Sequence, residues 1–178
     1  MSKSDEIALF LDDTGSRESL KVPDITRRDG MDCYGLGGIL VDGEHIGDVA
    51  RAHSAFCQQF DITYPLHSHK IRGGREEFAW LKNPEKGFEF LSAMSTFLCE
   101  LPVIGLAAII DRPGYVARYA ERHTHDLWYM DRTAYPILIE RAALYAQSRG
   151  RRLRVYFEQC GKTEDREILR IALSLIHI

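Results

Sequence analysis

Apolar residues gather in four short runs that are typical of buried β-strands. The first run, Ile7–Leu11, leads directly into Asp12 and Asp13. A later run, Val103–Ile110, has no polar face, so we expect it to be almost fully buried in a sheet with helices on both faces. The pattern predicts an α/β domain with a mixed sheet whose first two strands are antiparallel. The expected strands lie near residues 7–12, 34–41, 103–110 and 153–158.

Helical spacing of apolar residues predicts the helices between these strands. Apolar side chains recur every three or four residues over roughly 44–60 and again from Phe88 to Leu101. Thr133 and Pro136 suit the first turn of a third helix that runs to about Ser148. The remaining segments are predicted as a loop at 16–33, an extended or looped stretch at 64–75, a short helix at 76–81, a turn at Pro113-Gly114, an unassigned stretch at 115–132 and a helix after Gly161.

Length and composition describe an ordinary globular protein. The 178 residues, 45% hydrophobic and 28% charged, are enough for a single domain with a real core, which we place over residues 1–178. No apolar run approaches a membrane span and the N-terminus lacks a signal-peptide core, so we expect a cytoplasmic protein with no membrane partner. The net charge of −3 does not indicate nucleic-acid binding, which depends instead on a local basic patch. Reduced thiols are favoured over a zinc site because no paired spacing relates Cys33, Cys57, Cys99 and Cys160.

Acidic residues follow three of the predicted strands, at Asp12, Asp111 and Glu158. Glu140 and Asp165 lie on predicted helices beside the last of these strands. Carboxylates from neighbouring strands can bind two divalent ions, which hold the attacking water and the leaving oxygen of a phosphodiester in line. An exposed acidic turn would explain the acids after the first strand equally well if no other carboxylate approached them.

Several short motifs, taken in order, resemble one known family. The segment Phe-Leu-Asp-Asp-Thr-Gly at 10–15 resembles the strand and Asp-Glu-Ser-Gly signature of domain-of-unknown-function family 3800. The other motifs that look like landmarks of that family are Tyr-Gly-Leu-Gly-Gly-Ile-Leu-Val at 34–41, Leu66-His67-Ser68, Val155-Tyr156-Phe157-Glu158 and the run from Gly161 to Arg166. Together they cover most of the chain. The resemblance implies a ribonuclease H-like domain and a metal-dependent nuclease that acts on RNA or DNA.

The resemblance also implies roles for individual residues. Asp12 matches the first-strand carboxylate, Glu158 the fourth-strand carboxylate and Asp165 the acid a few residues later, which together are the expected catalytic residues. Glu140 matches the acid on the first core helix. Asp13 stands where the family has Glu, and Thr14 where it has Ser. The expected ligands of Mg²⁺ or Mn²⁺ are Asp12, Asp13, Glu140 and Glu158.

A basic, glycine-containing stretch is the candidate surface for nucleic acid. His67, Lys70, Arg72 and Arg75 lie on both sides of Gly73-Gly74 or close to them. Such residues can contact phosphates from a flexible loop, although an ordinary solvated loop has the same composition. His67 and His69 would point the same way on a strand, but without a third nitrogen or sulfur ligand they are better explained as surface or hydrogen-bonding histidines.

The end of the chain departs from the family. Ribonuclease H-like domains add a further strand and a closing helix that supplies the last metal-binding acid, whereas this chain stops at Ile178. The resemblance therefore implies an incomplete domain with weak or no nuclease activity as it stands. An uncovered sheet face would also favour self-association.

Other function classes agree less well with the sequence. A haloacid-dehalogenase-like phosphatase requires Asp-x-Asp, but Asp13 and Thr14 follow Asp12 here. A receiver-like phospho-acceptor domain requires strands that alternate regularly with helices, and no clear helix separates the first two strands. A non-catalytic module that binds nucleic acid or protein, in a mobile element or a phage-defence system, stays open as the alternative.

Overall fold

The computed structural model describes residues 5–17, 32–119, 130–158, 161, 166 and 168–170. The chain divides into two compact units, one built from Met1–Gly43 with Val103–Ile178 and the other from Glu44–Pro102. Each unit has its own cluster of buried apolar side chains. The expectation of a single domain concerns how these units fold together, and it stays a prediction.

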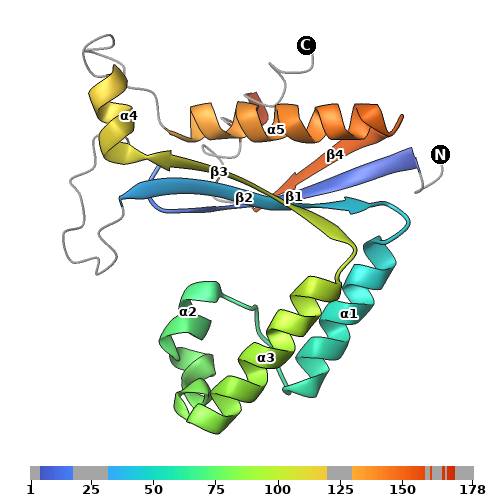
Figure 1. Cartoon of the computed structure of the whole chain (residues 1–178), viewed down its shortest axis with the longest axis vertical. Coiled ribbons are helices and arrows are strands. Elements are labelled where there is room, and N and C mark those ends of the chain that lie inside the picture. The colour runs from blue at the N-terminus through green and yellow to red at the C-terminus, as the bar shows by residue number, and fades with distance from the viewer. Residues whose placement is uncertain are drawn as a thin grey trace. The chain divides into compact units, whose positions relative to one another are not determined.

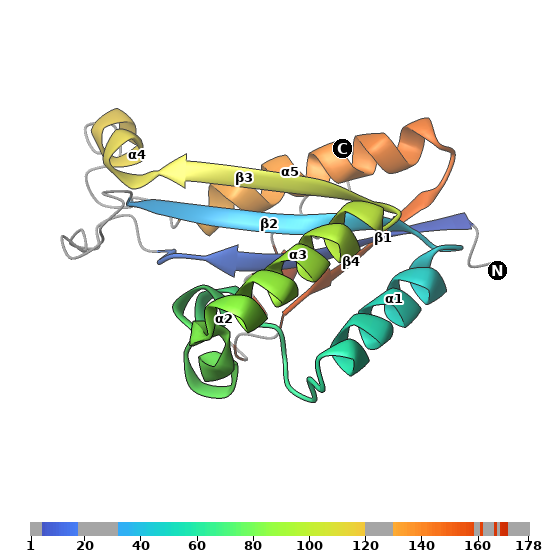
Figure 2. The same ribbon diagram turned by 60° about the horizontal axis from the view of Figure 1, so that its bottom comes forward.

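The first unit contains a four-stranded sheet, and its strands confirm the predicted positions (Figure 2). The strands are β1 (Glu6–Thr14), β2 (Cys33–Asp42), β3 (Val103–Asp111) and β4 (Arg152–Phe157). Their order is β3-β2-β1-β4, in which β2 is antiparallel to both β1 and β3, and β4 is parallel to β1. The mixed sheet and its antiparallel first pair are therefore as predicted.

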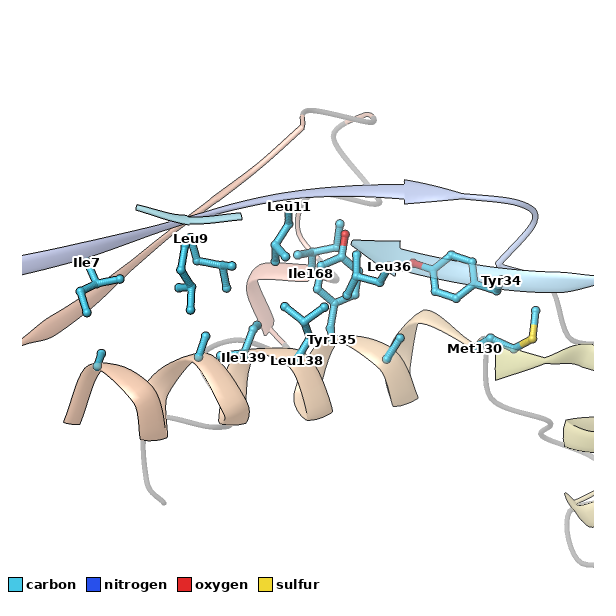
Figure 3. Packing of buried hydrophobic residues seen from close by; sticks show 14 residues of the cluster. Ile7, Leu9, Leu11, Tyr34, Leu36, Met130, Tyr135, Leu138, Ile139 and Ile168 are labelled. Carbon is cyan, nitrogen blue, oxygen red and sulfur yellow. The ribbon is translucent and has the colours of Figure 1, made fainter. Parts of the chain in front are cut away.

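Helix α5 (Asp131–Ser148) lies along one face of this sheet (Figure 1). Alternate residues of β1, namely Ile7, Leu9 and Leu11, point toward it and are buried in one cluster that also contains Leu138 and Ile139 (Figure 3). Burying each such side chain contributes about 1.5–3 kcal/mol. This packing fixes which residues of β1 face the helix and which face the other way.

Strand β3 corrects one prediction. We expected Val103–Ile110 to be almost fully buried, but β3 is an edge strand of the described sheet and the side chain of Ile109 is 73% exposed. Only its alternate residues Leu106, Ala108 and Ile110 pack on the core. Within the first unit α5 packs on one face of the sheet, and the expectation of helices on both faces stays a prediction. The opposite face of the sheet is called the open face below.

The second unit is helical and has an aromatic core. Its elements are α1 (Ile46–Gln59), α2 (Ser68–Gly73), η2 (Glu76–Lys82) and α3 (Pro84–Glu100), of which α1 and α3 lie side by side (Figure 1). Phe56, Phe78 and Phe90 are buried together with Ile62. The predictions at 44–60 and 76–81 are confirmed. The prediction of an extended or looped stretch at 64–75 is wrong for its centre, because α2 forms there and ends at Gly74 in the left-handed conformation.

Three helix boundaries also differ from the sequence prediction. Helix α3 begins at Pro84 because the side chain of Asn83 accepts hydrogen bonds from the two backbone N–H groups of Glu85 and Lys86. The turn expected at Pro113-Gly114 is the start of α4 (Arg112–Tyr119), and α5 begins at Asp131 rather than Thr133. In the described part of the chain, every helix is too short or too polar to cross a membrane.

Candidate functional site

The two acids that end β1 point to opposite faces of the sheet. Phe10 and Asp12 belong to the open face, whereas Leu11 and Asp13 belong to the face that packs on α5. The Asp12 side chain is exposed, and one of its oxygens, Oδ1, accepts a hydrogen bond of 2.8 Å from the backbone N–H of Asp13. A metal ion bound by Asp12 on the open face would therefore not share Asp13 as a ligand.

Glu158 directly follows the last residue of β4, the strand that pairs in parallel with β1. The parallel register pairs Phe10 with Tyr156 and Leu11 with Phe157. The paired register ends there; if it continued by one residue, Glu158 would lie opposite Asp12, and both residues are exposed. Neighbouring strands lie about 4.8 Å apart, which is within the reach of two carboxylates that share one divalent ion. Of the predicted acids that the structure describes, Asp12 lies on β1 and Glu158 directly follows β4, its parallel neighbour.

A shallow trough of about 530 Å³ opens on the same face. It runs from β1 across β2 to β3, with Asp12 and Thr14 on one side and Ala107 and Ile109 on the other. Gly35 and Gly37 form its floor, because the register sets them between these residues. The carboxylate of Asp12 therefore lies at the edge of a concave surface.

On the other face, Asp13 belongs to a separate polar cluster. Arg17 donates to Asp13 Oδ2 from Nε at 2.7 Å and pairs with it through Nη2 at 2.5 Å. The hydroxyl of Tyr34 donates to the same oxygen at 3.2 Å. Burial, and then the charge of Asp13, raise the pKa of Tyr34 far above its usual value, so the phenol stays protonated and is a donor at every physiological pH.

Asp131 is a buried acid next to this cluster that the sequence interpretation missed. It lies in the first turn of α5, and its Oδ1 accepts a hydrogen bond of 2.8 Å from the backbone N–H of Arg132. Burial raises its pKa, and the charge of Asp13 acts in the same direction, whereas Arg17 and Arg132 oppose them. The sequence interpretation missed Asp131 because this residue lies in the stretch at 115–132, to which no helix or strand was assigned. An acid followed two residues later by Thr133 was the available signal for a helix start.

The remaining predicted acids do not join Asp12. Glu140 is exposed on α5, while the buried positions of that helix face the sheet. Asp111 accepts a hydrogen bond of 2.7 Å from Gly114 N–H and so caps α4. Asp165 lies outside the described residues. Among the residues that the structure describes, no group of three or more His, Cys, Asp or Glu side chains is arranged to hold a metal ion.

The predicted basic surface lies in the second unit. His67, Arg72 and Arg75 are exposed on or beside α2. Lys70 is engaged by carboxylates instead, with Nζ 2.6 Å from Glu76 Oε2 and 3.1 Å from Glu77 Oε2. These ion pairs reduce the contribution of Lys70 to a phosphate-binding surface.

A buried arginine that follows β3 forms hydrogen bonds to residues at the end of β1 and at the start of β2. Arg112 is 4% exposed and follows β3 directly. Its Nε donates to Asp32 Oδ1 at 2.8 Å, just before β2, and its Nη2 donates to the carbonyl of Ser16 at 2.9 Å, just after β1. The backbone N–H of Arg112 also donates to the carbonyl of Asp32. One side chain therefore holds the ends of three strands in place.

The fold and site define an α/β protein with a mixed four-stranded sheet and exposed carboxylates at the ends of two parallel neighbours. The chain is similar to the uncharacterized protein y4pM of Sinorhizobium fredii, with 37% identity over 161 residues. The alignment covers 89% of this chain and 59% of that relative, so the chain spans less than two thirds of the relative's length. No family model and no solved structure matches the chain.

Proposed function

We propose that this chain forms part of a metal-dependent nuclease of domain-of-unknown-function family 3800, with a ribonuclease H-like sheet and a substrate of RNA or DNA. The observation that carries the proposal is the parallel pairing of β1, which carries Asp12, with β4, which Glu158 directly follows. The mixed sheet with an antiparallel first pair agrees with the fold that the resemblance implies. The cytoplasmic location expected from the sequence is part of this proposal.

The donor set fits Mg²⁺ or Mn²⁺. Mg²⁺ usually keeps several waters and is held by one or two carboxylates together with substrate phosphates, so Asp12 and Glu158 are a sufficient protein contribution for one ion. Such an ion supplies an activated water and neutralises charge on the phosphate. The backbone N–H of Asp13 orients the carboxylate of Asp12 for this role through the bond to Oδ1. Asp165 is retained in the proposal as a catalytic residue on the resemblance alone.

A non-catalytic binding module is the second candidate. The observation that favours it is that the described residues include no group of three or more potential metal ligands. A second ion, which in-line cleavage by two metals requires, would need ligands beyond Asp12 and Glu158. Such a module would keep the open face and its trough but would bind its partner without metal-dependent cleavage.

Mn²⁺ binding is the primary test, because it reports on the proposed metal site without requiring a substrate. We expect electron paramagnetic resonance titration to show Mn²⁺ binding that Asp12→Asn and Glu158→Gln each weaken at least about tenfold, which corresponds to roughly 1.4 kcal/mol. The matched control is Glu140→Gln, which removes an exposed carboxylate on the outer side of α5.

Cleavage is the second readout. Labelled single-stranded RNA, DNA and an RNA–DNA hybrid are incubated with the protein and Mn²⁺, and any cleavage should disappear in Asp12→Asn. Equal Mn²⁺ affinity in the wild type and both site variants would overturn the proposed metal site. Retention of the metal without cleavage of any substrate would favour the binding module.

A further inference from the structure

The open face presents an aromatic pair next to the acids. The rings of Phe10 and Tyr156 are stacked with centroids 4.9 Å apart and planes 10° apart. Phe10 is 38% exposed and Tyr156 is 42% exposed, so the stack is accessible to solvent. Exposed aromatic faces on a sheet surface are typical stacking platforms for nucleic-acid bases.

Charged side chains lie on both sides of the aromatic pair along β4. Arg154, Tyr156 and Glu158 are alternate residues and share the open face. The guanidinium of Arg154 is exposed and lies 3.1 Å from Glu6 Oε1. At about 3.3 Å per residue, the distance from Arg154 to Glu158 along the strand is roughly 13 Å, which is longer than a single nucleotide. A cation, an aromatic stack and a carboxylate pair thus follow one another along a line.

The trough beside Phe10 has room for a flat ligand. A Cβ added at Gly37 would meet only the carbonyl oxygen of Leu106, at 3.9 Å, which is an ordinary contact. The backbone of Gly37 is not in the left-handed region. Neither close packing nor an unusual φ therefore accounts for glycine at this position. Its effect is to keep the trough open between Asp12 and Ala107, its partners in register on either side.

We propose that the open face binds single-stranded nucleic acid, with one base against the Phe10 ring in the trough that Gly37 keeps open and the adjoining backbone running from Arg154 toward Asp12. The inference rests on the proposed nuclease function and adds its substrate class. A single strand is selected because its bases are free to stack on a protein surface, whereas those of a duplex are already stacked on one another. The guanidinium of Arg154 is paired with Glu6 but exposed, so it can contact a phosphate, a group that an apolar protein segment does not carry.

The test is fluorescence anisotropy with labelled 12-nucleotide oligo(U) and oligo(dT) and a hairpin duplex, in EDTA so that binding is separated from cleavage. We expect single strands to bind about tenfold or more tighter than the duplex. Gly37→Val, which fills the trough at a strand position that favours β-branched residues, should weaken single-strand binding about tenfold, and Phe10→Leu should do the same.

Two variants serve as matched controls. Gly105→Val also introduces a valine into a strand, at a position where a Cβ meets nothing within 4 Å, but Gly105 is outside the residues that line the trough. Phe88→Leu removes an aromatic ring that is 76% exposed on α3. Both should bind single strands as the wild type does, and thermal melting should show all four variants folded.

Each possible result supports or overturns either this inference or the proposed metal site. Unchanged oligonucleotide binding in Gly37→Val and Phe10→Leu, equal affinity for the duplex, or competition by uridine monophosphate as strong as by the oligonucleotide would each overturn the inference. Sedimentation that shows dimers lost in Gly37→Val, without any oligonucleotide binding, would assign the face to a second copy instead. If Mn²⁺ binding at Asp12 persists while single strands do not bind, this inference fails and the proposed metal site stands. If single strands bind but Mn²⁺ binding does not depend on Asp12, the stacking surface is supported and the nuclease proposal fails.

Discussion

Asp12 and Asp13 are consecutive in the sequence, but their side chains lie on opposite faces of the sheet. The carboxylate of Asp12 is exposed on the open face, whereas that of Asp13 is bound by Arg17 and by the hydroxyl of Tyr34 on the α5 side. The alternation of side chains along a strand produces this separation. Two residues that look equivalent in the sequence therefore have different roles, one in the candidate metal site and one in the packing of the fold.

This separation predicts different effects for the two substitutions. Asp13→Asn should leave Mn²⁺ affinity within about twofold of the wild type and destabilise the protein by about 1–2 kcal/mol, because it removes a partly buried ion pair with Arg17. Asp12→Asn should show the converse, with lost metal binding and little change in stability. Urea unfolding and Mn²⁺ titration on the same samples measure both effects. Loss of Mn²⁺ binding in Asp13→Asn would contradict the two-face assignment.

The buried acid of α5 predicts a pH dependence of stability. Burial raises the pKa of Asp131 in the folded state, against the charges of Arg17 and Arg132, which favour ionisation. The folded state therefore holds its proton more tightly than the unfolded state. The contribution of Asp131 to the free energy of unfolding is most favourable below the unfolded pKa and falls as the pH rises through the folded pKa.

Asp131→Asn should remove that dependence while retaining an oxygen that accepts from the backbone of Arg132. The stability of the variant relative to the wild type should therefore increase from about pH 3 to pH 7, by roughly 1.4 kcal/mol for each unit by which the pKa is raised. Urea unfolding of both proteins across this pH range gives the difference. A difference that is constant or falls with pH would show that folding does not raise the pKa of Asp131.

The arginine that joins three strand ends predicts a large stability effect. Arg112→Ala should destabilise the protein by about 3–5 kcal/mol, because it leaves the carboxylate of Asp32 without its partner and removes the bond to Ser16. Arg112→Lys should recover only part of this, since an ammonium does not reproduce the guanidinium fork. Arg118→Ala on the exposed side of α4 is the control and should change stability by less than about 0.5 kcal/mol. Equal unfolding midpoints for the Arg112→Ala and Arg118→Ala variants would show that the hydrogen bonds of Arg112 do not stabilise the sheet.

Local pattern in the sequence was enough to locate most elements. The apolar runs after Glu6 and after Pro102 and the alternation from Leu153 to Phe157 predicted strands that the structure contains. The helical spacing over 44–60 predicted α1 in the same way. These predictions succeeded because the period of apolar residues reflects the geometry of the element that must bury them. The acids that follow the strands were visible for the same reason, since each directly follows or ends an apolar run.

Only the tertiary structure decided which elements are neighbours and which face each residue serves. The apolar composition of Val103–Ile110 could not show that β3 is an edge strand, because an edge position is defined by distant pairing partners. Glu140 was a reasonable partner for Asp12 in the sequence, yet the rotation of α5 that buries Leu138 and Ile139 turns it to solvent. The strand that Glu158 follows lies next to the strand of Asp12 because β4 pairs in parallel with β1, although the two are far apart in the sequence. Periodicity specifies how a segment folds locally, whereas strand order and helix rotation follow from burying the apolar faces of the whole chain together.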